Sequence, residues 1–117
     1  MRINEIKNIL KAKVLCCENA MENAIVSGGS ADLLDTILYA AAKDCVLLTG
    51  AATLDSIRKA KVAEIGAIVM VRGKTPGKEI LNLARGNNIP VLATDFSLFV
   101  SSGRLYAAGL RGLDGTW

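Results

Sequence analysis

Three uninterrupted apolar runs, each followed by a segment of helical periodicity, constrain the fold more than any other feature of this chain. The runs are CVLLTG (45–50), AIVMVRG (67–73) and PVLATD (90–95). A continuous apolar run of this length is typical of a strand that is buried on both faces of a parallel sheet. Because the runs recur about every 22 residues, they predict right-handed βαβ crossovers. The fold class that we expect is α/β, a layered domain with a mostly parallel sheet.

Helices are expected before, between and after these strands. Apolar residues recur at helical spacing from Ile3 to Leu10, and again after each of the three runs. Each predicted helix has a residue suited to its start: Asn4, Thr53, Pro76 or Gly77, and Ser97. The last helix is expected to run from residue 98 to about residue 108.

The stretch IVSGGSADLL (25–34) has an apolar start, two glycines and then an amphipathic pattern. After a strand over 13–16, it predicts a short strand over 24–27, a turn at the glycines and a helix over 30–42. Such turns often hold phosphate, but SGGS has neither the GxxxxGK[ST] lysine nor the GxGxxG spacing. Asp32, in the first helical turn, would also repel an anion. A tight turn capped by Ser30 is therefore the favoured interpretation.

Length and composition predict one domain over residues 1–110 and a loose, glycine-rich tail over 111–117. Hydrophobic residues make up 51% of the chain, which is enough for a core. The net charge is +3, and the charged residues are scattered along the chain, which favours solvated helix faces over a nucleic-acid surface. The first residues lack the apolar core of a signal peptide, and no apolar run reaches the ~18 residues of a membrane span. We expect a cytoplasmic protein with no nucleic-acid or membrane partner.

The chain has three cysteines, Cys16, Cys17 and Cys45, and no CxxC pair. An odd number without cluster spacing argues against a disulfide framework and against a standard iron–sulfur cluster held by one chain. The thiols are expected to be small buried hydrophobes.

In an open parallel sheet, ligands bind beyond the carboxyl ends of the strands. The residues predicted at that edge combine glycines, hydroxyls and charged groups: Ser27, Gly28, Gly29, Ser30, Asp32, Gly50, Thr53, Arg72, Gly73, Thr94 and Asp95. Two interpretations stay open, because such residues serve an anion but also serve as turns and helix caps. Arg72, which ends a buried strand, suits an anionic ligand or a carboxylate of a protein partner.

Arrangements typical of catalysis are scarce. The chain has no histidine, which excludes Ser–His and Cys–His pairs and imidazole metal ligands. Asp95 has no second acid near it in the sequence to help hold Mg²⁺. We predict no catalytic residue and no metal site.

Several segments together resemble the family of short bacterial and archaeal DRTGG-domain proteins. The segments that carry the resemblance are LLTG, AIVMVRGKTP, IPVLAT and GRLYAAGL, and it extends from the first helix to about Leu110. The Asp-Arg-Thr-Gly-Gly signature itself is absent. The stretch from Ser27 to Ser30 lies about where that signature is expected.

The resemblance implies a regulatory and dimer-forming module, because DRTGG domains accompany CBS domains in regulated pyrophosphatases and occur in phosphotransacetylases and cobyrinic-acid-synthase-like proteins. Stand-alone members are often encoded near iron-only hydrogenase and histidine-kinase-like genes, which implies a partner in a redox or signalling system. We expect a non-catalytic homodimer that binds a protein partner or an anion, such as an adenine nucleotide or phosphate, at the strand-end edge. The alternatives are a hydrogenase or electron-transfer accessory factor, with a cluster bridged between chains by Cys16 or Cys17, and an enzyme acting on a nucleotide or acyl phosphate.

Overall fold

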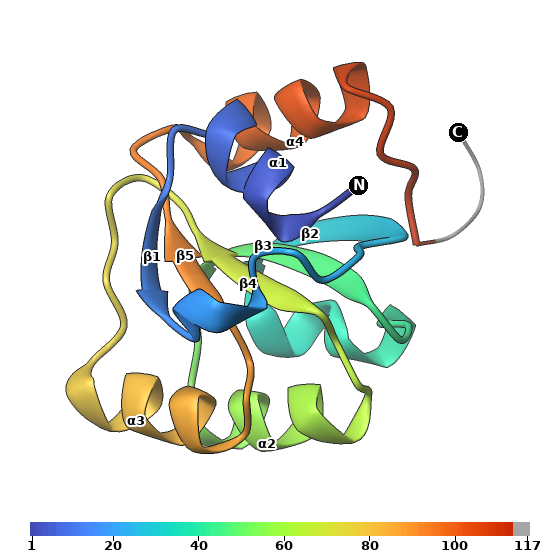
Figure 1. The fold of residues 1–117 in the computed structure, drawn as a ribbon. Helices are drawn as coiled ribbons and strands as arrows, with labels where there is room; N and C mark the ends of the chain where they lie inside the picture. The colour runs from blue at the N-terminus through green and yellow to red at the C-terminus, as the bar shows by residue number, and fades with distance from the viewer. Residues whose placement is uncertain (114–117) are drawn as a thin grey trace.

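A computed structural model describes residues 1–113 and shows a five-stranded sheet between two layers of helices (Figure 1). The strand order is β1-β5-β4-β3-β2, in which β1 runs antiparallel to β5 and all other neighbours are parallel. The strands are β1 (Lys13–Cys16), β2 (Ser27–Leu33), β3 (Cys45–Ala51), β4 (Ala67–Met70) and β5 (Val91–Ala93). The α-helices are α1 (Ile3–Ile9), α2 (Leu54–Val62), α3 (Lys78–Gly86) and α4 (Leu98–Ala107). The expected α/β class and mostly parallel sheet are confirmed.

The central strands are buried on both faces. On β3, Val46 and Leu48 join the core beneath α1 and α4, whereas Leu47 joins the core that packs on α2 and α3 (Figure 1). Successive side chains of a strand point to opposite faces, so a strand with helices on both sides needs apolar residues at every position. This explains the uninterrupted apolar runs in the sequence.

Most predicted helix starts are correct. Thr53 and Ser97 cap α2 and α4 with their side chains, and Gly77 is the residue before α3. The predicted cap at Asn4 is wrong, because α1 already begins at Ile3. The residue at that N-cap is Arg2, whose backbone amide donates to a glutamate carboxylate of the first turn at 3.0 Å.

The segment from 24 to 42 differs from the prediction. The strand begins only at Ser27, and Gly28 and Gly29 lie inside it, so they do not form a turn. The helix expected from Ser30 is wrong, because β2 continues to Leu33 and two short 3-10 helices, Leu34–Thr36 and Leu38–Ala40, follow. Pairing with β3 along the strand satisfies the backbone groups of β2 that point toward β3.

The start of the predicted tail is tied to the sheet. The Gly28 amide donates to the Arg111 carbonyl at 2.9 Å, and the Leu113 amide donates to the Gly28 carbonyl at 3.1 Å. Residues 114–117, the rest of the predicted tail, lie outside the described residues.

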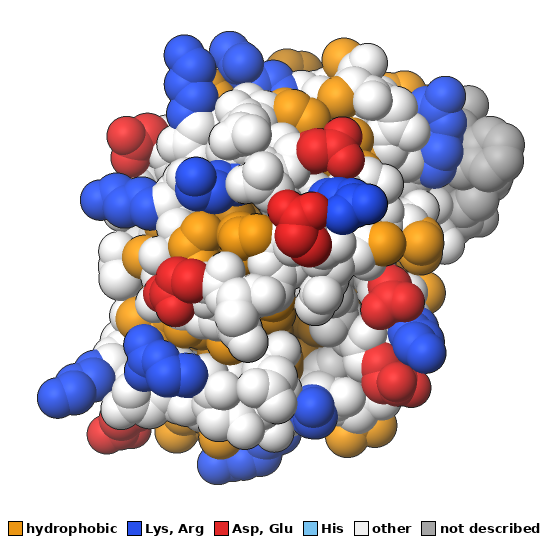
Figure 2. All heavy atoms as spheres, in the orientation of Figure 1, with side chains coloured by type: hydrophobic (Ala, Val, Ile, Leu, Met, Phe, Trp, Pro, Cys, Tyr) orange, Lys and Arg blue, Asp and Glu red, His pale blue; other side chains and the backbone are white. Residues whose placement is uncertain are grey.

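The surface seen in Figure 2 carries positive and negative side chains interspersed over the same face. Among residues 1–113, no helix has the length and apolar character needed to cross a membrane.

Candidate functional site

The structure separates the predicted edge residues into three groups. Gly28, Gly29 and Ser30 lie partway along β2, with Gly28 and Ser30 on the face toward α4 and Gly29 on the opposite face. Asp32 lies near the end of β2 beside Gly50, and a third group follows β4 and β5. The third group consists of Arg72, Gly73, Thr94 and Asp95. Ser27 begins β2 and lies outside the cavity described below. The sequence had placed all of these residues along one edge because it ended β2 six residues too early.

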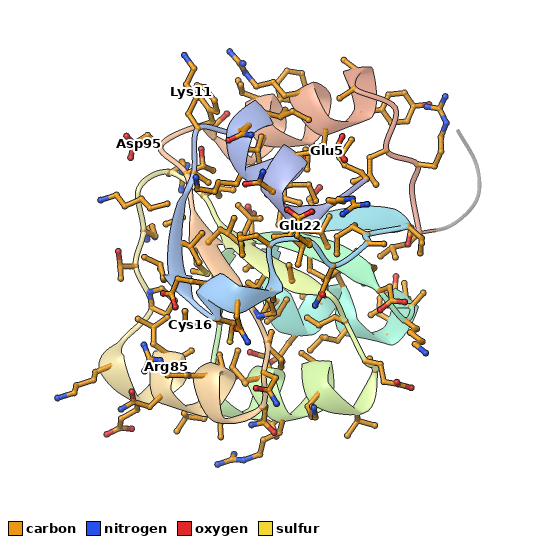
Figure 3. All side chains as sticks on the ribbon, viewed as in Figure 1. Glu5, Lys11, Cys16, Glu22, Arg85 and Asp95 are labelled. Atoms are coloured by element: carbon orange, nitrogen blue, oxygen red, sulfur yellow. The ribbon has the colours of Figure 1, made fainter. Side chains whose placement is uncertain are left out.

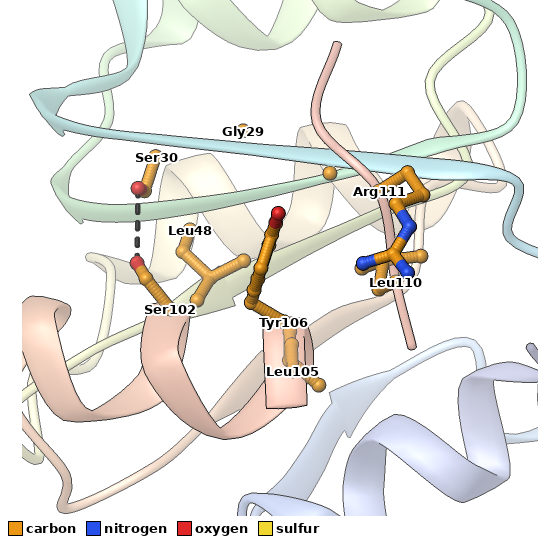
Figure 4. Close-up of a pocket in the computed structure, with 9 residues that line it drawn as sticks. Gly29, Ser30, Leu48, Ser102, Leu105, Tyr106, Leu110 and Arg111 are labelled. Atoms are coloured by element: carbon orange, nitrogen blue, oxygen red, sulfur yellow. Dashed lines mark hydrogen bonds between the residues drawn. The ribbon is translucent and has the colours of Figure 1, made fainter. Parts of the chain in front are cut away.

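A cavity of about 190 Å³ opens between β2 and α4 (Figure 4). Its walls come from both elements, from β3 and from the segment after α4, namely Gly28, Gly29, Ser30, Leu48, Ser102, Leu105, Tyr106, Leu110 and Arg111. Three leucine side chains contribute an apolar wall, and two serine hydroxyls lie at one end. Such a combination of apolar wall and few polar groups is typical of small-molecule sites.

The serine pair at one end of the cavity provides a hydrogen-bond acceptor for a ligand. The Oγ atoms of Ser30 and Ser102 lie 3.0 Å apart, and Ser102 Oγ lies 2.7 Å from the Leu98 carbonyl oxygen. A hydroxyl has one hydrogen. Since Ser102 donates it to the Leu98 carbonyl, Ser30 donates to Ser102. The remaining lone pairs of Ser30 Oγ can then accept a hydrogen bond from a ligand.

The other end of the cavity carries an aromatic ring and a cation. Figure 4 shows the Tyr106 ring between the serine pair and Arg111. The Arg111 guanidinium carbon lies 5.2 Å from the centre of the Tyr106 ring, within the range of a cation–π contact. Both residues are exposed, so they lie where a bound ligand would meet solvent.

Asp32 and Gly50 form a separate structural contact. The buried Thr49 hydroxyl lies 3.1 Å from the carbonyl oxygens of both Asp32 and Ala51. Asp32 lies in a strand rather than in a first helical turn, so the argument that it repels an anion through a helix terminus is wrong. Thr53 caps α2, and its Oγ1 accepts from the Ser56 amide at 3.1 Å.

The third group joins the turns after β4 and β5. The Arg72 amide donates to the Phe96 carbonyl and the Gly73 amide to the Thr94 carbonyl, each at 2.8 Å. The Thr94 hydroxyl donates to a buried carbonyl at 2.6 Å. These three donors are therefore used inside the protein and are not available to an anion. The Asp95 side chain points away from the sheet in Figure 3, where a partner could reach it.

Residues that the sequence did not single out complete the cavity. Ser102, Tyr106 and Arg111 follow one another on α4 and just beyond it. The spacing of four residues between Ser102 and Tyr106 was a signal of a shared helix face, whereas Arg111 lies beyond the end of α4. The sequence did not show which residues lie opposite them, because the extent of β2 could not be predicted from it.

Two of the three cysteines, Cys17 and Cys45, lie in surroundings that favour the neutral thiol. Cys16 is fully buried and its Sγ lies 3.3 Å from the Ile89 carbonyl oxygen, at the end of β1 (Figure 3). Burial, followed by the adjacent Cys16, raises the pKa of the Cys17 thiol to about 11. Burial also raises the pKa of Cys45. Iron–sulfur clusters need thiolates, so these sites disfavour cluster binding. Among residues 1–113, no three acidic, cysteine or histidine residues gather as metal ligands.

Comparison with known families decides the relationship of the chain. The model of the DRTGG domain matches residues 5–108. The chain belongs to the DRTGG-domain family. The expected family resemblance is thereby confirmed. A search of curated proteins gave no match to this DRTGG domain.

One solved structure similar to this DRTGG domain is the CBS and DRTGG region of the regulatory part of Clostridium perfringens pyrophosphatase, complexed with its activator diadenosine tetraphosphate. The two chains are 19% identical and align with a TM-score of 0.68 over 89% of this chain and 45% of that one. The likeness supports the fold. This DRTGG domain thus spans less than half of the similar chain.

Proposed function

We propose that this DRTGG domain is a non-catalytic regulatory module that binds an adenine nucleotide in the cavity between β2 and α4. The observation that carries the proposal is the cavity itself, in which an apolar wall, the Ser30 acceptor and the exposed Arg111 converge. The similar pyrophosphatase region is bound to an adenine dinucleotide activator, which supports adenine nucleotides as the first ligands to test.

The size and lining of the cavity fit one moiety of such a ligand. Its volume of about 190 Å³ is below the range of roughly 300–1,000 Å³ for complete ligand sites. A planar base fits between the leucine side chains, with its amino group donating to Ser30 Oγ. The phosphates would then lie outside, beside Arg111, whose guanidinium suits phosphate oxygens.

The lining supports binding rather than catalysis. Its described residues include no carboxylate, and the chain has no histidine. A general base for hydrolysis or phosphoryl transfer is therefore not provided by this cavity. Three free thiols suit a reducing compartment such as the cytoplasm.

Titration calorimetry and thermal shift with AMP, ATP, diadenosine tetraphosphate, adenosine and inorganic phosphate test the proposal. Ser30→Ala is expected to weaken every adenine ligand by about 1 kcal/mol, the typical contribution of one hydrogen bond. Ser27→Ala, on the same strand but outside the cavity, is the matched control. Arg111→Gln should weaken the phosphorylated ligands but not adenosine. If none of these compounds binds to the wild-type protein, the proposed function is wrong.

We also propose that the module is a homodimer, built on a groove of about 520 Å³ between α2 and the 3-10 helix Leu38–Ala40. Tyr39 and Val62 at this groove are 90% and 84% exposed. Large apolar side chains with this exposure are typical of an interface. The groove carries one acid, Asp35, and two cations, Arg58 and Lys59, of which Lys59 pairs with Asp55 of its own helix. A copy related by a two-fold axis would bring the Asp35 of one chain to the Arg58 of the other.

Light scattering tests the dimer. Asp35→Arg should dissociate it by placing like charges together, and Arg58→Asp should do the same. The double variant should restore the dimer, and Val26→Asp, at an exposed position outside the groove, should leave it intact. A wild-type protein that is monomeric at high micromolar concentration would contradict the proposal. The groove would then be a candidate binding surface for a different protein.

A further inference from the structure

Four residues after α4 cross the free edge of the sheet. We call residues Leu110 to Leu113 the C-terminal strap. Gly112 of the strap forms a parallel bridge with Gly28 of β2, and the two hydrogen bonds of this bridge join Gly28 to the strap residues on either side of Gly112. The strap therefore adds a short stretch of strand to the edge of β2.

The strap holds both faces of β2 at once. Leu110 belongs to the core beneath α1 and α4, and Leu113 packs against the core on the other side of the sheet. A Cβ atom added to Gly28 would lie 2.8 Å from Leu110 Cδ2, and one added to Gly29 would lie 2.5 Å from Leu113 Cδ1. Glycine is disfavoured in a strand interior unless another group approaches closely. The absence of a side chain at the two glycines thus leaves the space in which the two strap leucines pack.

The same strap forms a wall of the candidate ligand site. Leu110 and Arg111 line the cavity, opposite the serine pair (Figure 4). Arg111 also contacts the Tyr106 ring of α4. If the strap left β2, the cavity would lose its apolar wall at Leu110 and its cation together.

We propose that docking of the C-terminal strap and ligand binding in the cavity are thermodynamically linked. A ligand that contacts Leu110 and Arg111 binds the docked form better, so it holds the strap on β2, and the docked strap raises the affinity for the ligand to the same degree. This linkage rests on the ligand-binding function proposed above. It gives the module an output, because ligand binding would then hold Leu113 at the sheet edge.

Two backbone amides report strap docking directly, since the amides of Gly28 and Leu113 make the bridging hydrogen bonds. Hydrogen exchange measured by NMR on the full chain would compare the free protein with the protein saturated by the tightest-binding nucleotide among AMP, ATP and diadenosine tetraphosphate. We expect nucleotide to slow exchange of these amides about tenfold, within the usual range of coupling between sites.

Two variants undock the strap in different ways. Leu113→Ala removes the side chain that packs on Gly29 without causing a clash, and Gly29→Val fills the space that this side chain occupies. Both are expected to speed exchange at Leu113. Leu113→Ala, which lies outside the cavity lining, is also expected to weaken nucleotide binding about tenfold. The matched controls are Leu33→Ala, on an exposed part of β2, and Gly86→Val, at a position where an added Cβ atom meets nothing within 4 Å. Both controls should bind as the wild type does.

The outcomes separate this inference from the proposed function. Nucleotide binding without a change in exchange at Leu113, or unchanged affinity in Leu113→Ala, would overturn the linkage and leave the proposed function standing. Absence of binding by the wild-type protein to every nucleotide would overturn the proposed function, and the linkage with it.

Discussion

Thr53, Ser97 and Ser30 were all predicted as hydroxyl caps of helices, yet their surroundings give them different roles. The side chains of Thr53 and Ser97 accept hydrogen bonds from backbone amides of α2 and α4. Ser30 lies in a strand and bonds to Ser102 across the cavity. A hydroxyl whose acceptor capacity is used by a helix start has less to offer a ligand, so only Ser30 remains a binding candidate among these three.

Thr53→Ala tests this distinction. Loss of the N-cap should lower the free energy of unfolding by about 1 kcal/mol, while nucleotide affinity stays at the wild-type value. Urea denaturation and calorimetry would measure the two effects. Thr75→Ala, at an exposed position outside the helices, is the control. If Thr53→Ala lowered the affinity for nucleotide without changing the free energy of unfolding, Thr53 would be a ligand contact rather than only a helix cap.

The Cys17 thiol predicts a pH dependence of stability. Its pKa is raised from 9.0 to about 11, chiefly by burial, so the folded state favours the neutral thiol. A group whose pKa is raised on folding stabilises the protein below its unfolded pKa. This contribution should be lost as the pH rises from about 9 to about 11. Urea denaturation across this window should show a steeper loss for the wild type than for Cys17→Ser, and parallel curves would contradict the assignment.

At the scale of elements, β2 and the helices show where periodicity succeeds and where it fails. The helices α2, α3 and α4 were predicted close to their observed bounds, because amphipathic spacing and caps agree there. In β2, the glycines suggested a turn because glycine is most common in turns. The local sequence does not reveal that Leu110 and Leu113, some eighty residues later, pack on those glycines.

Two serines of α4 and its cap should respond to alanine in opposite ways. The Ser101 hydroxyl is fully buried and has no hydrogen-bond partner within the described chain. Ser101→Ala is expected to raise the free energy of unfolding, by about 1 kcal/mol, because it removes the cost of an unpaired buried hydroxyl. Ser97→Ala should lower it by about 1 kcal/mol through loss of the cap. Denaturation of both variants would decide, and a destabilised Ser101→Ala would reveal an unseen partner.

At the scale of the whole molecule, each face of the sheet is covered by its own layer of helices, and the candidate ligand site lies on one of these two faces. Residues next to one another on β3 therefore report on different faces. Leu48 lines the cavity beneath α4, and Leu47 is buried against the other helix layer. Their contributions to stability should be alike, whereas their contributions to binding should differ.

Leu47→Ala and Leu48→Ala form a matched pair for this purpose. Each is expected to lower the free energy of unfolding by roughly 2–5 kcal/mol, the usual cost of truncating a buried leucine. Only Leu48→Ala should change the affinity for nucleotide, because it alone alters the cavity wall. Equal effects of both variants on affinity, measured at a temperature where both are folded, would contradict the placement of the site.

The sequence by itself determined the α/β class, the three central parallel strands and the helices that follow them. These follow from local rules, since burial on both faces requires continuous apolar runs and helix starts require particular caps. The tertiary structure decided the course of β2, the place of the C-terminal strap and the candidate site that they enclose with α4. Those features depend on contacts between Gly28, Ser30, Ser102 and the strap leucines. Such contacts join residues far apart in the chain, and no local pattern records them.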